Sequence, residues 1–384
     1  MKPQLVRITR NPIDTDKPLE YPLYRENGVL LANKGAVLNE AQSTIIRETE
    51  EIFTSLGDLS AYYEAKESKL PGKAANDESN NSSYNPIRQL DVLEKELLRI
   101  YYSPSRASSL EDLIWMRARI RSICKHAPDA ALAKIFLDNK RLYSVQHAIH
   151  VAVLVELTTS FLNWSNEQIE SLVGASLTMN ISMGILQDRL QKQSKPLNEQ
   201  QKNLISAHPT KSVEILKKIG IKDSAWMESV LKHHETPDGL GYPSQLKLEN
   251  IPISATLLRM ADVYCAKISG RSYRNPMLPH IAAKDLFVGI DKEVHSEIVS
   301  AFLKILGLFP PGTLVRMSNK EIGIVFKRGE KINTPIVKIL LGKNSLKAHS
   351  PKIVKADDDK NKIIDIVSHK QLSQKGNFID LWNL

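Results

Sequence analysis

Apolar residues recur at spacings of three and four across residues 110–309, and few segments there alternate as strands do. This period places apolar side chains on one face of a helix, so the pattern predicts a bundle of helices. Capping boxes at Ser165 and Asn198 support it, because a short side chain there accepts hydrogen bonds from the first turn. We expect Pro209 to interrupt one helix, Gly220 to end the next, and a further helix to cover residues 253–268.

The two ends of the chain have a different pattern. Asn27-Gly28 separates two short apolar runs, which is a strong hairpin signal because both residues tolerate positive φ. Residues 313–341 hold three strand-like runs separated by turn residues, which predict an antiparallel meander. The chain is therefore expected to be mainly α, with a small N-terminal α+β domain and a short C-terminal β meander.

The same patterns predict the domain boundaries. The expected units are an N-terminal domain at 1–65, a flexible linker at 66–88, a helical domain at 89–310, a small β extension at 311–345 and a charged tail at 346–384. The linker is rich in Pro, Gly, Asn and Ser and lacks the apolar residues that offset ordering entropy. We expect the tail to be poorly ordered apart from a short strand near 363–367.

Composition narrows the class of protein. In 384 residues, 52 Lys and Arg stand against 43 Asp and Glu, and this net charge of +9 suits either anionic partners or solubility alone. Aromatic residues are 6% and are not interleaved with basic runs, so we expect no DNA or RNA binding. No apolar run approaches the ~18 residues of a membrane span, and the N-terminus carries no secretory signal. With two cysteines, the expected location is the cytoplasm.

The segment LKHHETPDGLGYP, residues 231–243, carries the clearest chemical signal. It places His233 and His234 at a predicted helix end, before a loop shaped by glycines and prolines. Three further candidates lie on other predicted helices: His147, His208 and Asp262. Four imidazoles and a carboxylate that converge in a bundle core suit Mn, Fe, Zn or Ni.

The order of six motifs resembles the HD-GYP family, bacterial cyclic-di-GMP phosphodiesterases within the HD metal-dependent phosphohydrolase superfamily. The motifs are His147, His208-Pro209, His233-His234-Glu235, Asp238-Gly239-x-Gly241-Tyr242-Pro243, Ala261-Asp262-Val263 and Arg271-x-x-Arg274. The resemblance implies an HD-type helical bundle over roughly residues 110–345 and cyclic-di-GMP as the ligand. It also implies metal ligands at His147, His208, His233, His234 and Asp262. The implied ligand-binding residues are Arg271, Arg274, Gly241, Tyr242 and Pro243.

This sequence departs from the family at its name-giving pair. Met179 and Asn180 stand where the family has His and Asp, Met183 replaces a Lys that contacts phosphate, and Tyr143 stands where members with a third metal carry Glu. In the family, the Asp at the position of Asn180 bridges two cations. Asn offers one neutral oxygen, and the thioether of Met is a poor ligand for hard divalent ions. We therefore expect no dinuclear centre and no catalytic residue.

A single divalent metal (Fe, Mn, Zn or Ni) on His208, His233 and His234 stays open, as does no metal at all. Arg271 and Arg274 suit phosphate through their forked guanidinium groups, or pair with acidic neighbours instead. For Glu235 and Asp238 we favour stabilisation of the loop over acid–base chemistry.

Three functional hypotheses follow. The leading one is a degenerate HD-GYP protein that binds cyclic-di-GMP or a partner with little hydrolysis. The alternative is an active metal-dependent phosphodiesterase with a reduced metal site. The third is a scaffold that docks a signalling protein such as a diguanylate cyclase.

Overall fold

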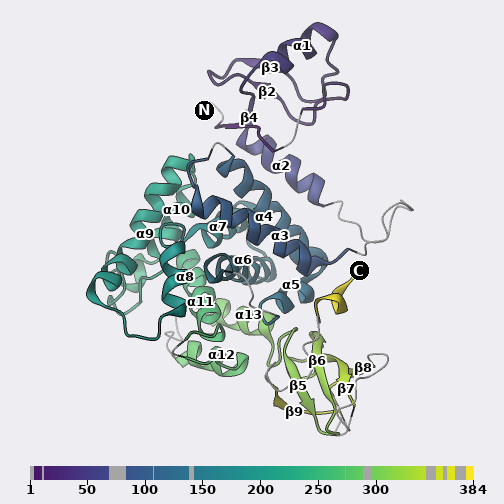
Figure 1. The fold of residues 1–384 in the computed structure, drawn as a ribbon, viewed down its shortest axis with the longest axis vertical. Coiled ribbons are helices and arrows are strands. Elements are labelled where there is room, and N and C mark those ends of the chain that lie inside the picture. Colours follow the sequence, from purple (N-terminus) through teal and green to yellow (C-terminus); the bar gives the residue numbers. More distant parts are fainter. Residues whose placement is uncertain are drawn as a thin grey trace.

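The computed structural model has a central bundle of helices, with one small sheet at the N-terminal end and another at the C-terminal end (Figure 1). It describes residues 4–10, 13–68, 84–106, 108–137, 142–272, 274–288, 296–342, 352–357, 361–367 and 378–384. The predicted class, mainly α with small antiparallel sheets at both ends, is confirmed.

Helix α6 (Tyr143–Phe161) runs through the middle of the bundle, where Figure 1 shows it nearly end-on. All of its residues from Tyr143 to Thr159 are buried, as expected of a helix that is apolar on every side. The surrounding helices are α3 (Pro86–Tyr102), α4 (Ser109–His126), α5 (Pro128–Lys134), α7 (Asn166–Thr178), α8 (Gly184–Lys192), α9 (Glu199–Ile219), α10 (Ser224–Lys232), α11 (Ile253–Ile268), α12 (Pro279–Val288) and α13 (Ser296–Leu306). Among the described residues, no helix is both long and apolar enough to cross a membrane.

The N-terminal unit is a four-stranded antiparallel sheet with two helices. Its strands β1 (Leu5–Arg7), β2 (Leu23–Tyr24), β3 (Leu30–Ala32) and β4 (Phe53–Ser55) lie in the order β1-β4-β2-β3. The predicted hairpin is confirmed, since β2 pairs with β3 and Gly28 has φ of 85°. Helix α1 is Glu40–Glu48, and α2 (Leu56–Glu67) packs against α4, which joins the unit to the bundle.

The C-terminal sheet is also antiparallel, and it is larger than predicted. The expected meander is β5 (Leu314–Met317), β6 (Ile322–Lys327) and β7 (Ile336–Leu341). Two more strands, β8 (Ile353–Lys355) and β9 (Ile363–Ile366), pair with the edges of that meander in the order β8-β7-β6-β5-β9. Strand β9 confirms the strand expected near 363–367.

The expectation of a poorly ordered tail is wrong for the part of it that the structure describes. Strand β8 covers the edge of β7, which would otherwise leave unpaired backbone groups. The short helix η3 (Phe378–Trp382) packs against the start of α3, where Nδ2 of Asn85 donates to the Ile379 carbonyl at 2.9 Å. Apolar side chains spaced between charges, such as Val354 and Trp382, are buried by these contacts.

The predicted helix break at Pro209 is also wrong, because α9 continues without interruption from Glu199 to Ile219. Proline lacks the N–H that would bond the carbonyl four residues earlier, which belongs to Ile205. Nδ1 of His208 donates to that carbonyl instead, at 2.5 Å. Gly220 ends the helix in the left-handed conformation, as predicted.

The predicted linker at 66–88 is shorter at both ends. Helix α2 continues to Glu67, and α3 begins at Pro86, a position where a missing N–H costs nothing. Residues 69–83, the middle of the predicted linker, lie outside the described residues.

Candidate functional site

Three of the predicted histidines converge. His208 lies in the middle of α9, and His233 and His234 follow the last turn of α10. One ring nitrogen of each lies within 4.8 Å of the others. His208 and His233 are buried and His234 is half-buried. In the described part of the chain this is the group that can hold a metal ion, and it contains no carboxylate.

Hydrogen bonds determine which nitrogens of this trio are free. Nδ1 of His208 donates to the Ile205 carbonyl, and Nδ1 of His233 donates to the Val230 carbonyl at 2.7 Å. Carbonyl oxygens only accept, so in the neutral rings each Nε2 keeps a free lone pair. The two Nε2 atoms lie 3.3 Å apart. A tetrahedral ion about 2.05 Å from both nitrogens would separate them by about 3.3 Å, so the pair fits a shared cation.

The imidazoles of the trio are held in the neutral form. Burial, helped by the neighbouring His233, lowers the pKa of His208 to about 3. Burial also lowers the pKa of His233, and it lowers the pKa of His234 well below its usual range. Because metals bind unprotonated imidazole, the trio is in its ligand form at neutral pH.

The two other predicted metal ligands contact each other. Nε2 of His147 on α6 lies 2.6 Å from Oδ1 of Asp262 on α11, and the Tyr143 hydroxyl lies 3.3 Å from Nδ1 of His147. Burial opposes ionisation of Asp262, but the hydrogen bond and charge of His147, followed by His234 and His233, lower the pKa of Asp262 below its usual range. The carboxylate therefore stays ionised, and one of its oxygens is hydrogen-bonded to His147.

The segment that departs from the family lies beside the trio. Met179 and Asn180 directly follow α7 and are 0% and 2% exposed. The Ser182 hydroxyl donates to the His208 carbonyl at 2.9 Å, which ties this turn to α9. Met179 packs in the apolar core, while Oδ1 of Asn180 is buried without a hydrogen-bond partner among the described residues. Such an unsatisfied oxygen costs about 1–3 kcal/mol, so the position is poorly suited to a neutral amide.

The loop after α10 is built around Glu235. Its buried carboxylate accepts the backbone N–H of Ser244 at 2.6 Å and that of Leu246 at 2.9 Å. Asp238 accepts the Thr236 hydroxyl and the Leu240 N–H. Both carboxylates thus accept the hydrogen bonds that the predicted loop-stabilising role requires.

The Gly-Tyr-Pro part of this loop lies directly against the trio. A Cβ at Gly241 would meet the Thr236 nitrogen at 2.4 Å, so only glycine allows the backbone to pass so close. This approach lets the Tyr242 ring stack on His234 with 4.7 Å between ring centroids. Pro243 follows through a cis peptide bond and is exposed, as is Leu240 at 82%.

The two predicted phosphate-binding arginines have different surroundings. Arg271 and Arg274 are joined by backbone hydrogen bonds of 2.8 and 3.0 Å in a tight turn. The Arg271 guanidinium lies 6.0 Å from the centre of the Tyr143 ring, which places it on the side of His147. One nitrogen of Arg274 donates to the Ala266 carbonyl at 2.6 Å, near the end of α11.

One charged residue near the site was not predicted. Arg259 lies on α11 one turn before Asp262 and is half-buried. Burial lowers the pKa of Arg259, and the charges of Asp262, Asp238 and Tyr242 act on it in the opposite direction. Its spacing of three before Asp262 places both side chains on one helix face, and that spacing is the signal that could have identified it.

Comparison with known proteins relates part of this chain to a known domain. A family model described as an HD domain matches residues 131–288. The cyclic di-GMP phosphodiesterase PA4108 of Pseudomonas aeruginosa is 26% identical over 225 residues, which are 58% of this chain and 54% of that protein. The cyclic di-GMP phosphodiesterase PdeB of Borreliella burgdorferi is 22% identical over 180 residues, 47% of each chain. The chain spans about half the length of these curated relatives.

Among solved structures, Bd1817, an HDG"Y"P protein from Bdellovibrio bacteriovorus, aligns with a TM-score of 0.48 and 13% identity, over 79% of this chain and 99% of that one. Residues 131–288 therefore form an HD domain, and the chain is a homologue of proteins named cyclic di-GMP phosphodiesterases.

Proposed function

We propose that this chain is a degenerate HD-GYP protein of cyclic-di-GMP signalling, which binds the nucleotide or a partner and hydrolyses little. The observation that carries the proposal is the neutral, unsatisfied Asn180 beside three imidazoles that include no carboxylate in their group. Two divalent cations bring four positive charges, and Asp262, the nearby anion, is engaged by His147. Too little negative charge remains for a second ion.

We assign recognition of the nucleotide to the residues that surround His208, His233 and His234. The names of the relatives point to cyclic-di-GMP, whose two phosphates are anionic. Arg271 supplies a permanent positive charge on the Tyr143 side, and the loop from Gly241 to Pro243 supplies the half-buried Tyr242 ring and the exposed Pro243. Arg274 adds charge next to Arg271, although one of its nitrogens is taken by Ala266. Location in the cytoplasm remains a prediction.

A second candidate is an active phosphodiesterase with one metal on His208, His233 and His234. The 3.3 Å between the two Nε2 atoms favours it, because that spacing fits a bound cation. A metal there would polarise a phosphate oxygen and activate water. The protein would hold the ion through unprotonated Nε2 atoms, kept in place by the carbonyls of Ile205 and Val230.

The metal content distinguishes a reduced centre from a complete one. Purified protein should carry no more than one equivalent of Fe, Mn, Zn or Ni per chain, and His233→Ala should lose it because a two-nitrogen site binds weakly. Elemental analysis, run beside a cyclic-di-GMP turnover assay, measures both quantities. Two tightly bound equivalents would contradict the proposal, and turnover that His233→Ala abolishes would favour the second candidate.

Arg271→Ala should weaken cyclic-di-GMP binding about tenfold to a hundredfold, since a charge-assisted hydrogen bond to phosphate contributes about 1.5–3 kcal/mol. Isothermal titration calorimetry at physiological salt measures it. Arg99→Ala is the matched control, because that side chain is 63% exposed on α3 and pairs with Glu96. Natural protein that binds no cyclic-di-GMP would refute nucleotide recognition, and ligand-independent capture of a diguanylate cyclase would then support a scaffold.

A further inference from the structure

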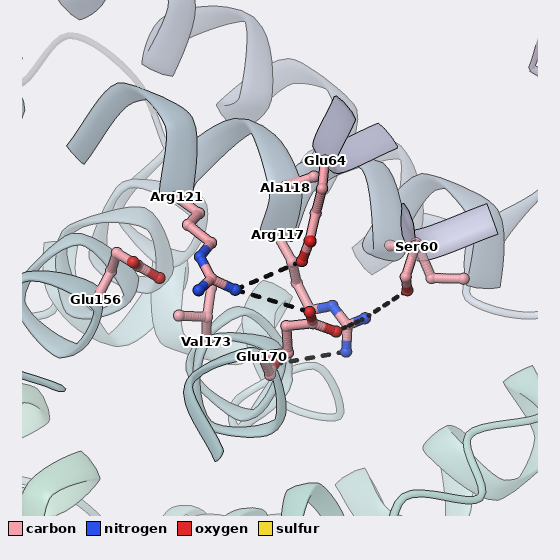
Figure 2. Close-up of a pocket in the computed structure, with 9 residues that line it drawn as sticks. Ser60, Glu64, Arg117, Ala118, Arg121, Glu156, Glu170 and Val173 are labelled. Carbon is pink, nitrogen blue, oxygen red and sulfur yellow. Dashed lines mark hydrogen bonds and ion pairs between the residues drawn. The ribbon is translucent and has the colours of Figure 1, made fainter. Parts of the chain in front are cut away.

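A small, partly open pocket lies where α2 of the N-terminal unit packs against α4, α6 and α7 of the bundle (Figure 2). Its space is about 10 Å³, which is room for about one water molecule. The polar lining consists of Ser60, Glu64, Arg117, Arg121, Glu156 and Glu170. Three carboxylates face two guanidinium groups, so the pocket holds one negative charge too many when every group is ionised.

Glu156 is the least compensated of these groups. It is 3% exposed, and Oε1 accepts the Ser160 hydroxyl at 3.0 Å. Oε2 is buried without a hydrogen-bond partner among the described residues. An ionised carboxylate in such a place costs more free energy than the neutral, protonated acid, because an unpaired charge loses more hydration than a neutral polar group does. Burial raises the pKa of Glu156 to about 7, although Arg121 opposes this change.

Glu64 and Glu170 compete for the same cation. Nη1 of Arg121 lies 3.4 Å from Oε1 of Glu64 and 3.7 Å from Oε1 of Glu170, so the two carboxylates converge from different helices (Figure 2). Arg117 contacts Glu170 at 3.2 Å. Two carboxylates this close favour a shared proton. Burial and the hydrogen bond with Glu64 raise the pKa of Glu170 to about 7.

Other ionisable groups around the pocket change this balance little. Asp223, which precedes α10, acts on Arg117. Cys124 of α4 lies near Glu156, but burial raises the pKa of its thiol well above the usual range, so the thiol stays neutral. Burial lowers the pKa of Arg117, and the carboxylates of Glu170 and Asp223 oppose this change. The protons that the pocket binds near neutral pH therefore belong to Glu156 and Glu170.

We propose that this pocket is a proton-binding site that sets how firmly the N-terminal unit is docked on the helical bundle. When Glu156 and Glu170 are protonated, no carboxylate charge is buried unpaired on α6, and Glu64 on α2 faces a neutral partner on α7. When the site loses its protons, Glu64 on α2 and Glu170 on α7 repel each other across the junction, and the Glu156 charge is buried unpaired. Because the folded pKa values exceed those of unfolded chains, the contribution is present in acid and is lost as pH rises through about 7.

Hydrogen exchange of the α2 amides tests the proposal in the full-length protein. After correction for intrinsic exchange, the protection of α2 should fall at least about tenfold between pH 6 and pH 8 in the natural chain. In Glu156→Gln/Glu170→Gln, where neither side chain can ionise, the fall should be less than twofold. Glu167→Gln, an exposed neighbour on α7, is the matched control and should behave as the natural chain does.

The infrared band of a protonated carboxylic acid supplies a second readout that needs no folded variant. Natural protein should show this band at pH 6 and lose most of it by pH 8, and Glu156→Gln/Glu170→Gln should lack most of it at both pH values. Equal α2 protection at both pH values, unchanged pH dependence in the double variant, or no carboxylic acid band at pH 6 would each overturn the proposal.

Discussion

Met179→His combined with Asn180→Asp should make this chain a metal-dependent phosphodiesterase, with at least about a hundredfold more cyclic-di-GMP hydrolysis than the natural chain shows. The two substitutions restore the family's name-giving pair on a turn that is already tied to His208 through Ser182. A carboxylate at 180 adds the anionic oxygens that a second cation requires. Turnover with added manganese or iron, measured by separation of the nucleotide products, checks the result.

The same double variant should depend on metal for its stability. Position 180 is 2% exposed, and an unpaired carboxylate at a buried site costs about 3–5 kcal/mol. A metal present at a hundred times its Kd raises the free energy of unfolding by about 2.7 kcal/mol. Thermal unfolding should therefore show a large gap between chelated and manganese-loaded double variant, and a smaller one for the natural chain.

Met183→Lys alone is the control, because it adds the charge that the family carries nearby without adding an anionic ligand. It should leave hydrolysis at the level of the natural chain. A double variant that binds no more metal than the natural chain would show that missing negative charge is not what limits this site.

Local signals predicted the helices well. Helix α11 covers Ile253–Ile268 as expected, and both capping boxes, at Ser165 and Asn198, are formed. These features depend on residues within one or two turns of each other, which a sequence displays directly. The convergence of His208, His233 and His234 followed only from the resemblance to a family, because it joins helices α9 and α10 through tertiary packing.

What the sequence did not reveal depends on partners that are distant or unusual. The break expected at Pro209 does not occur because the His208 side chain donates the hydrogen bond that the missing N–H would have made. Helix propensities do not include such a side-chain hydrogen bond. Strand β8 is only three residues long and lies in a charged segment, so its position depends on pairing with β7. His147 and Asp262 are 115 residues apart in the sequence, so no local pattern predicts their contact.

Glu111→Ala should destabilise the N-terminal unit by about 3–5 kcal/mol, the largest stability effect that we expect from one substitution. Glu111 lies in the first turn of α4 and is fully buried. Its Oε2 accepts the backbone N–H and the hydroxyl of Thr9, both at 2.6 Å, and the backbone N–H of Arg10 at 2.9 Å. Its Oε1 accepts the Tyr63 hydroxyl at 2.8 Å.

The effect is large because one carboxylate satisfies four donors at the junction between the N-terminal unit and the bundle. Alanine would remove the acceptor that the donors of Thr9, Arg10 and Tyr63 share, and a lost hydrogen bond to a charged group costs about 1.5–3 kcal/mol before relaxation. Hydrogen exchange of β1 and β4, together with urea unfolding, measures the change. Glu199→Ala is matched to it, since Glu199 also lies in the first turn of its helix but is 81% exposed. That control should lose less than about 1 kcal/mol, and an equal loss in both variants would mean that Glu111 acts only through the helix dipole.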